Sequence, residues 1–483
     1  MMYWLRRRIH PTWHFTILCI GVVLGVALAA RIDAFWQSGW LVVALVVAAT
    51  ALYGRWRVLL VASLLAGMLF GLWRGDMSRA NLTVFHDMYG RHVQVRGTVA
   101  SDVEIGIRGQ TVLRINNLHD HTGRSLPGVL RISTLDKRAI KRGDQVVADG
   151  KLQEGFGTLA ATMGDARLVE VTRVAGGDPA LEVRDSFSEA ISRAVADPAA
   201  SLGVGYLLGQ KQALPRHLQD ALVITGLTHV VVASGYNLTI LVRLARRLFA
   251  RVSKYLAALA SIVMIGSFVA VTGLSPSMTR AGLVSMLGIW AWYYGRMFHP
   301  ATLLAATASV TVLWNPSYAW GDVGWLLSFA AFAGVMIVAP LLRAYFYGRQ
   351  KPSFIGQILG ETVAAQLMTT PIILVVFGQF SLIAVVSNLL VVPLIPLAML
   401  LTFIAGFGAL VIPAATAVVG WPAQVLLDLT IGVVNYTAGI PWAQAKFSLP
   451  VIGVVLWYGV IAGGCSYLAW RTKLRLREVS LVE

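Results

Sequence analysis

Long apolar segments separated by short polar loops dominate this chain. Three of them open it, at about 12–30, 40–53 and 58–73. Further apolar segments follow residue 220, at about 221–242, 255–274, 279–295, 301–314, 323–342, 354–377, 381–411, 415–438 and 450–470. A helix that crosses a bilayer core of about 30 Å needs roughly 20 apolar residues. The pattern therefore predicts a polytopic α-helical membrane protein.

Residues 80–177 interrupt this pattern. Their apolar runs shorten to strand length and alternate with polar residues, as in residues 92–96 and 128–132, which is the period of a β-strand with one buried face. Strands are expected near 91–100, 110–117, 128–134, 145–153 and 166–174. The region therefore predicts an inserted small β-barrel, for which the oligonucleotide-binding type is one candidate.

The composition of this β domain leaves its role open. Residues 80–177 contain 13 Lys and Arg against 10 Asp and Glu, a balance of only +3. Aromatic side chains on which bases could stack are few, essentially Phe85, Tyr89 and Phe156, whereas single-strand binding surfaces rely on such stacking. A purely structural barrel and a DNA-binding barrel both remain open.

The net charge of +17 is arranged in clusters that flank apolar segments. These clusters lie at 6–8, 55–57, 243–254, 343–351 and 471–477. The positive-inside rule then predicts a multi-pass protein of the cytoplasmic membrane, with both termini in the cytoplasm and the β domain outside. The first apolar segment is interpreted as a retained anchor rather than a cleaved signal. The two cysteines, in separate apolar segments, imply no disulfide.

The expected domain organisation has four parts. Residues 180–220 mix charged residues with Leu, Val and Ile, which favours amphipathic helices on the membrane surface. The parts are N-terminal transmembrane helices (1–79), the extracytoplasmic β domain (80–177), amphipathic interfacial helices (178–220) and a transmembrane channel domain (221–483).

Polar residues within the apolar segments are the candidates for function. His229, Ser234 and Asn237 fall in one apolar segment, 221–242. A polar side chain at bilayer depth costs free energy unless it is paired or hydrated, so a group of them suggests a site or a pathway. The alternative is that Ser234 bonds to its own helix, Asn237 lies near the interface and His229 is a satisfied core residue.

The later segments carry further polar residues. Arg280 begins an apolar segment after a Gly- and Ser-rich turn, and Asp322 is a possible counter-charge or a helix cap. Pro371, Pro393 and Pro396 interrupt other segments, and broken helices at membrane depth line water or lie buried in protein. Snorkelling of Arg280 and helix–helix hydrogen bonding are the alternatives to a polar conduit. The residues expected along the conduit are His229, Ser234, Asn237, Arg280, Asp322, Glu361, Gln366 and Asn388.

No recognised catalytic or cofactor motif occurs. The sequence contains no P-loop, no His-Glu-x-x-His, no Gly-x-Ser-x-Gly, no His-x-His-x-Asp-His and no Cys-x-x-Cys. We therefore predict that the chain is not an enzyme, with no catalytic residues, no metal site and no cofactor.

Several motifs in a fixed order resemble the ComEC family of competence proteins. They are Tyr206-Leu207-Leu208-Gly209, Gly226-Leu227-Thr228-His229 with Ala233-Ser234-Gly235, Gly273 to Arg280, Asp322-Val323-Gly324-Trp325-Leu326-Leu327-Ser328-Phe329, Ala365-Gln366 with Thr370-Pro371, and Phe377-Gly378-Gln379-Phe380-Ser381 with Ser387-Asn388-Leu389-Leu390. The resemblance implies a channel that passes single-stranded DNA across the cytoplasmic membrane during natural transformation, with an oligonucleotide-binding-like domain on its outer side.

The resemblance has two departures. Many members carry a second histidine where this chain has Asn237, which puts any two-histidine mechanism in question. Their frequent C-terminal metallo-β-lactamase-like domain has no counterpart here, because the chain ends shortly after Arg477. Besides single-stranded DNA and membrane lipids, the expected partners are therefore a separate DNA receptor, a nuclease and a cytoplasmic helicase or ATPase. The competing interpretations are a transporter or flippase for another anionic polymer or lipid, and a scaffold that transports nothing.

Overall fold

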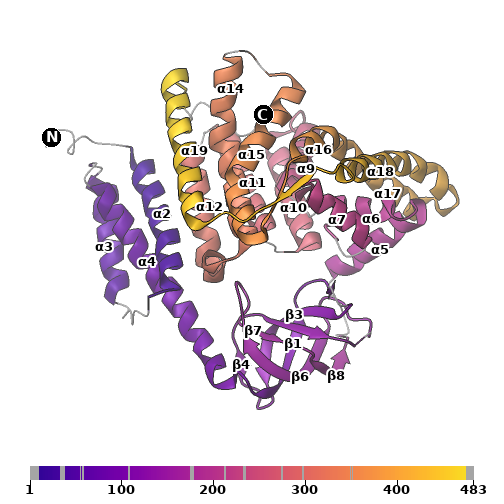
Figure 1. Cartoon of the computed structure of the whole chain (residues 1–483), viewed down its shortest axis with the longest axis horizontal. Coiled ribbons are helices and arrows are strands. Elements are labelled where there is room, and N and C mark those ends of the chain that lie inside the picture. The colour runs from indigo at the N-terminus through magenta and orange to yellow at the C-terminus, as the bar shows by residue number, and fades with distance from the viewer. Residues whose placement is uncertain are drawn as a thin grey trace. The chain divides into compact units, whose positions relative to one another are not determined.

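A computed structural model of the chain divides into two compact units (Figure 1). The first, which we call the barrel unit, comprises Met1–Glu182 and Ala305–Asp322, and the second, the helical unit, comprises Val183–Leu304 and Val323–Glu483. The structure describes residues 10–32, 39–54, 56, 59–106, 109–136, 138–173, 179–210, 214–231, 235–273, 276–295, 299–348, 350 and 352–474.

The barrel unit opens with α2 (Pro11–Ala29), α3 (Gly39–Gly54) and α4 (Leu59–Leu82). Helices α2 and α4 approach so closely that their glycines face backbone directly. A Cβ atom at Gly25 would lie 2.2 Å from the carbonyl oxygen of Met68, and one at Gly71 would lie 2.2 Å from that of Val22. Small residues let membrane helices pack at this distance, so these glycines set the spacing of the pair.

Two arginines on α4 satisfy the carbonyl ends of neighbouring helices. The last carbonyl groups of a helix have no partner within it and carry partial negative charge. Arg79 Nη1 donates to the carbonyl oxygen of Ala29 at 2.7 Å, at the end of α2. Arg74 Nε donates to that of Leu313 at 3.0 Å, at the end of α12 (Pro300–Trp314). These guanidinium groups are therefore paired with helix ends rather than left in an apolar layer.

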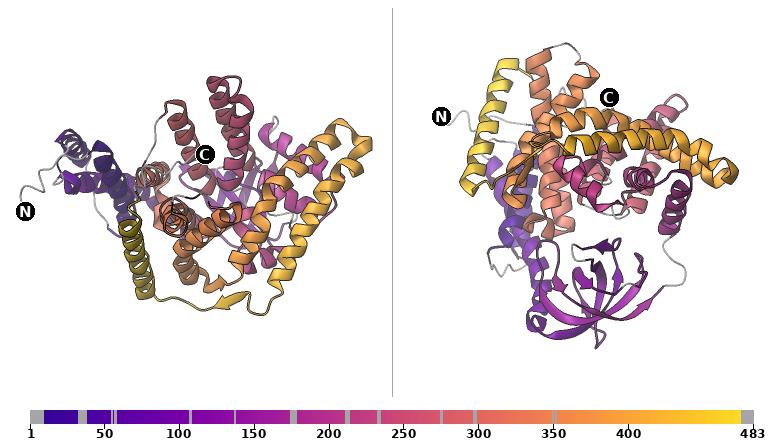
Figure 2. Two further views of the ribbon diagram at one scale, coloured as in Figure 1. Left: turned by 90° about the horizontal axis from the view of Figure 1, so that it is seen from above. Right: turned by 45° about the vertical axis from the view of Figure 1, so that its right-hand side comes forward.

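The β domain is a closed five-stranded barrel (Figure 2). Its strands are β1 (His92–Val99), β3 (Thr111–Asp120), β5 (Leu130–Thr134), β7 (Ala161–Met163) and β6 (Gln145–Glu154), joined in that order, with β1 and β6 paired to close it. All pairs are antiparallel except β5 with β7. This is the Greek-key barrel of the oligonucleotide-binding type, so the predicted inserted barrel is confirmed.

The shorter elements of this domain complete it. Strands β2 (Glu104–Ile105) and β4 (Ser125–Leu126) pair with β3, and β8 (Arg167–Thr172) pairs with β6 outside the ring. The five expected strands are all present, but the last of them is β8, and the ring is completed by β7, which was not expected. The 3₁₀ turn η1 (Thr83–Met88) places Phe85, fully buried, in the barrel core.

The helical unit contains most of the remaining helices. They are α5 (Pro179–Ala194, which begins in the barrel unit), α6 (Ala199–Leu208), α7 (Arg216–Ile224), α8 (Thr228–Val231), α9 (Gly235–Phe249), α10 (Lys254–Thr272), α11 (Pro276–Tyr293), α13 (Val323–Ala333), α14 (Ala339–Tyr347), α15 (Phe354–Phe377), α16 (Ala384–Val391), α17 (Ile395–Val411), α18 (Thr416–Ala438) and α19 (Val451–Thr472). By length and composition, eight candidate membrane spans occur among the described residues of the whole chain, which confirms a polytopic α-helical membrane protein.

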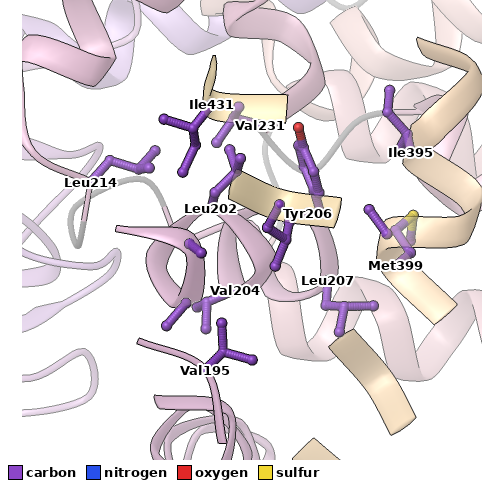
Figure 3. Packing of buried hydrophobic residues seen from close by; sticks show 14 of the residues in the cluster. Val195, Leu202, Val204, Tyr206, Leu207, Leu214, Val231, Ile395, Met399 and Ile431 are labelled. Carbon is purple, nitrogen blue, oxygen red and sulfur yellow. The ribbon is translucent and has the colours of Figure 1, made fainter. Parts of the chain in front are cut away.

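Helix α6 lies at the centre of the helical unit's core. All ten of its residues are buried, and Figure 3 shows its side chains among Val231, Ile395, Met399 and Ile431. Gly203 and Gly205 let Thr402 and Val231 pack directly against α6. The expected position of residues 178–220 at the membrane interface stays a prediction.

The apolar segment 221–242 does not form one continuous helix. Helix α7 ends at Ile224, α8 covers only Thr228–Val231, and α9 begins at Gly235. The physical cause of the first break is Gly226, whose φ of +70° lies in the left-handed region that favours glycine. A Cβ atom there would also lie 2.7 Å from Ala384 Cβ, so the turn packs tightly on α16.

The close pairing of α2 and α4 predicts opposite effects for two identical substitutions. Gly71→Ala should lower the thermal unfolding midpoint, because its new methyl group meets the Val22 carbonyl, and overpacking costs about 1–3 kcal/mol. Gly266→Ala, in α10, has nothing within 4 Å of the new atom and should be neutral or stabilising, since Ala favours helices. Thermal unfolding of the detergent-solubilised chain measures both. Equal shifts for the two variants would contradict this packing.

Candidate functional site

The first turn of α9 is the point where several of the predicted site residues meet. Its first residue, Gly235, packs on α11: a Cβ atom there would lie 3.0 Å from Ala281 Cβ and 3.2 Å from Arg280 Nη2. Only glycine allows this approach without displacing the guanidinium. The positive end of the α9 dipole therefore lies beside a permanent cation, in a unit built mostly of apolar helices.

Asn237, in the same turn, connects α9 to α6. Its side chain is fully buried, and its Nδ2 donates to the carbonyl oxygen of Tyr206 at 3.0 Å. Tyr206 belongs to the last turn of α6, where carbonyl groups lack a partner within the helix. Asn237 thus satisfies a buried acceptor and holds the start of α9 against the core helix.

Arg280 is held by contacts from α13. Its Nε donates to Ser328 Oγ at 2.7 Å, and Ser328 Oγ in turn lies 3.5 Å from Ser277 Oγ. The guanidinium carbon lies 5.1 Å from the centre of the Phe332 ring, within the range of a cation–π contact. Within the helical unit, no described carboxylate forms an ion pair with Arg280. Its positive charge is therefore positioned by neutral groups rather than neutralised.

Glu361 on α15 supplies a negative charge near the same turn. It lies close enough to Tyr236 of α9 for electrostatic interaction, and its Oε1 accepts a hydrogen bond from Gln357 Nε2 at 2.9 Å, one turn earlier on α15. The Tyr236 side chain is 42% exposed. Gly235 and Asn237, on either side of Tyr236, thus contact α11 and α6.

His229 lies on α8, the element that directly precedes α9. Its Nδ1 and the carbonyl oxygen of Gly226 are 3.0 Å apart. Because a carbonyl oxygen only accepts, Nδ1 carries the proton in this hydrogen bond, which leaves Nε2 as the acceptor nitrogen of the neutral ring. As a whole residue, His229 is exposed.

The other predicted residues do not join this group. Asn388 is buried and its Nδ2 donates to the carbonyl of Ala384 in its own helix, while Gln366 lies half-buried farther along α15. Asp322 belongs to the barrel unit, so its pairing with Arg280 stays a prediction. Ser234 lies outside the described residues. The structure therefore brings Asn237, Arg280 and Glu361 to the start of α9.

Sequence reasoning missed two sets of polar residues. Ser328 lies within the motif that begins at Asp322, but only the structure shows that it holds Arg280. Asp428 lies at mid-length of α18, exposed, and its Oδ2 accepts from Gln424 Nε2 at 2.8 Å. The signal for Asp428 was present, because a carboxylate inside an apolar segment is itself a reason to suspect function.

Metal binding has no support in the part of the chain that the structure describes. No group of three or more His, Cys, Asp or Glu side chains there is arranged to hold a metal ion. The chemistry of the site is therefore that of a fixed cation, amide and hydroxyl donors and one nearby carboxylate, which suits the recognition of an anion by hydrogen bonds and charge.

Comparison with known proteins gives one family and one relative. Residues 206–472 match the family model described as competence protein. The chain is 26% identical over 215 residues to ComE operon protein 3 of Bacillus subtilis (strain 168), an alignment that covers 42% of this chain and 27% of that relative. The matched part of the chain thus corresponds to about a quarter of the relative's length. No solved structure matches.

The buried contact between Asn237 and Tyr206 predicts a loss of stability on truncation. Asn237→Ala leaves a buried carbonyl group without its donor, at a cost of about 1–3 kcal/mol, and should lower the thermal unfolding midpoint of the solubilised chain. Asn435→Ala, at an exposed position of α18, is the matched control and should change it little. If both variants unfolded like the wild type, Asn237 would have no bracing role.

Proposed function

We propose that this chain, which belongs to the family of competence proteins and so takes part in DNA uptake, passes single-stranded DNA across the cytoplasmic membrane through its helical unit. The family match covers more than half of the chain and includes every residue that meets at the start of α9. The observation that carries the finer proposal is the cation held there without a neutralising carboxylate among the described residues of its unit.

The chemistry of the cargo explains why such a cation is useful. A DNA strand carries one negative charge per phosphate, and a charge in hydrocarbon costs several kcal/mol, so the strand needs a hydrated path. Arg280 and the start of α9 both favour a negative charge at one point of that path. Hydroxyl and ring contacts from Ser328 and Phe332 hold the guanidinium ready without cancelling its charge.

The remaining residues fit roles around that point. Asn237 fixes the position of α9 against α6 and acts as a positioning residue. Glu361 repels phosphate and keeps the strand from binding too tightly, which conduction requires. His229 lies on the short helix that precedes α9 and is proposed to contact the strand through Nε2, since Nδ1 is bonded to the Gly226 carbonyl. Ser234, Asp322, Gln366 and Asn388 are proposed to line other parts of the same path.

The proposal assigns cutting and pulling of DNA to other proteins. The sequence has no nucleotide-binding or hydrolase motif, so a receptor, a nuclease and a motor are expected as separate partners. The β domain is proposed to lie outside the cytoplasm. Its surface carries balanced pairs such as Arg138–Asp136 and Arg114–Glu104, which suits a supporting role in addition to any contact with DNA.

The positive charge of Arg280 should be required for uptake. Arg280→Gln should lower internalised DNA by about tenfold, the effect of roughly 1.4 kcal/mol, while DNA bound at the cell surface stays unchanged. Arg280→Lys should retain part of the activity because it keeps the charge and loses the planar donor group. Arg251→Gln, at an exposed position, is the control. Wild-type uptake by Arg280→Gln at normal expression would show that the positive charge is not required. Arg280 would then be an arginine that only extends its charged end toward the membrane interface.

A charge swap separates phosphate contact from pairing with Asp322. If Arg280 acts on phosphate, the double variant Arg280→Asp with Asp322→Arg should remain inactive in the same assay. Recovery of most of the uptake lost in either single variant would show that the two residues form a structural pair. Deletion of the gene with no loss of internalised DNA would reject the transport proposal as a whole and favour a scaffold or another cargo.

A further inference from the structure

A basic and aromatic cluster lies where α9 ends, α10 begins and α11 ends, away from the candidate site. Arg246 and Lys254 both lie over the ring of Trp292, at 5.5 Å and 5.6 Å from its centre, and Lys254 also lies 5.6 Å from the centre of the Tyr293 ring. We propose that this cluster, Arg246, Lys254, Trp292 and Tyr293, binds the phosphate headgroup of an anionic phospholipid.

The first argument is a positive charge for which no described residue of the helical unit provides an ion pair. Helices α9, α10 and α11 contain no Asp or Glu. The charged groups that act on Arg246 are Arg243 and Arg247, both cations. Two cations therefore share one tryptophan ring beside further arginines. An anion beside these cations would reduce their mutual repulsion, because unlike charges attract strongly at short range.

The second argument is a hydrogen-bond donor without an acceptor. Arg246 Nη1 is buried and has no hydrogen-bond partner within the described structure. Leaving such a donor unpaired costs free energy. Attraction to the α9 dipole would account for arginines near its C-terminal end, but it does not satisfy this N–H group. A phosphate oxygen would satisfy it once the side chains that cover Nη1 move aside, because guanidinium groups bind phosphate through directed, charge-assisted hydrogen bonds.

The third argument is position and surroundings, which favour a lipid over a free phosphate. Lys254 is the first residue of a candidate membrane span, so the cluster lies at the level expected for headgroups. Tyrosine and tryptophan gather at that level in membrane proteins. Large apolar side chains nearby are exposed, namely Leu244, Leu248, Phe249, Tyr255, Leu259, Trp290 and Tyr294. They provide a surface for acyl chains, which neither inorganic phosphate nor DNA possesses.

Basic side chains between membrane helices are known to bind lipid headgroups. Two features distinguish this cluster from a surface that attracts anionic lipids only by its overall charge. The cation–π contacts place Arg246 and Lys254 on one ring, and Arg246 Nη1 has no hydrogen-bond partner among the described residues. Neighbouring Arg247 is exposed and has no ring contact among the described residues. Arg246 and Arg247 therefore form a matched pair of equal charge.

The test is lipid binding by the purified full chain in a non-ionic detergent. Phosphatidylglycerol retained by the chain is measured by native mass spectrometry during titration, with phosphatidylcholine of the same acyl chains as the zwitterionic reference. We expect clear preference for phosphatidylglycerol. Arg246→Met should weaken its binding about tenfold, and Arg247→Met less than about twofold. Lys254→Met, at an exposed position, should also weaken it and serves if Arg246→Met does not fold.

Three outcomes would overturn the proposal. Equal losses in Arg246→Met and Arg247→Met would show diffuse attraction rather than a site. Equal retention of the two lipids would show no headgroup recognition. Displacement of phosphatidylglycerol by millimolar inorganic phosphate, or by a short oligothymidylate, would assign the cluster to free phosphate or to nucleic acid. None of these measurements involves DNA uptake, so their result is independent of the transport proposal.

Discussion

The constraint on which this structure depends is that a bilayer core offers no water to polar groups. Each donor and acceptor within the helices must find a partner in the protein or face a hydrated space. Serine and threonine hydroxyl groups satisfy this requirement by donating hydrogen bonds to carbonyl oxygens one turn earlier, as Ser261 and Thr430 do. Arg79 donates to a carbonyl oxygen at the end of α2, and Asn237 donates to one at the end of α6.

The functional candidates are the charged groups that do not satisfy this constraint within the described protein. Arg280 is positioned by a hydroxyl group and a ring, yet its charge is not cancelled by a described carboxylate of its own unit. Arg246 keeps a bare N–H group in a cluster of cations. In a membrane protein such charges are retained only with an anion or water nearby. The two anions that we propose are the phosphates of a DNA strand at Arg280 and a lipid phosphate at Arg246.

The spacing of apolar residues predicted the membrane helices and most of the barrel strands. It did not predict the short strand β7, the burial of α6 or the break at Gly226. Alternating residues located the strands of the barrel, but β7 is only three residues long, too short to show a period. The sequence around α6 predicts amphipathic helices, because the flanking residues are charged. In the structure all ten residues of α6 are buried. The break at Gly226 was hidden inside an apolar segment, since nothing in composition distinguishes a left-handed glycine from a helical one.

The site was predictable in part for a related reason. Polar residues in apolar segments pointed to Asn237, Arg280 and Glu361, which the structure brings to one helix turn. Their partners could not be predicted, because Ser328 and Tyr206 are ordinary residues whose roles follow from tertiary contact. The positions of Ser234 and Asp322 relative to that turn stay predictions.

The central claim is that incoming DNA passes the first turn of α9. The most direct measurement places a photo-crosslinking amino acid at Tyr236, which is partly exposed beside Gly235 and Asn237, and irradiates competent cells while labelled DNA is being taken up. The account predicts a covalent adduct between the chain and single-stranded DNA, and no adduct from the same probe at Trp421, an exposed position of α18. Normal uptake without any adduct at Tyr236, or equal adducts at both positions, would contradict it.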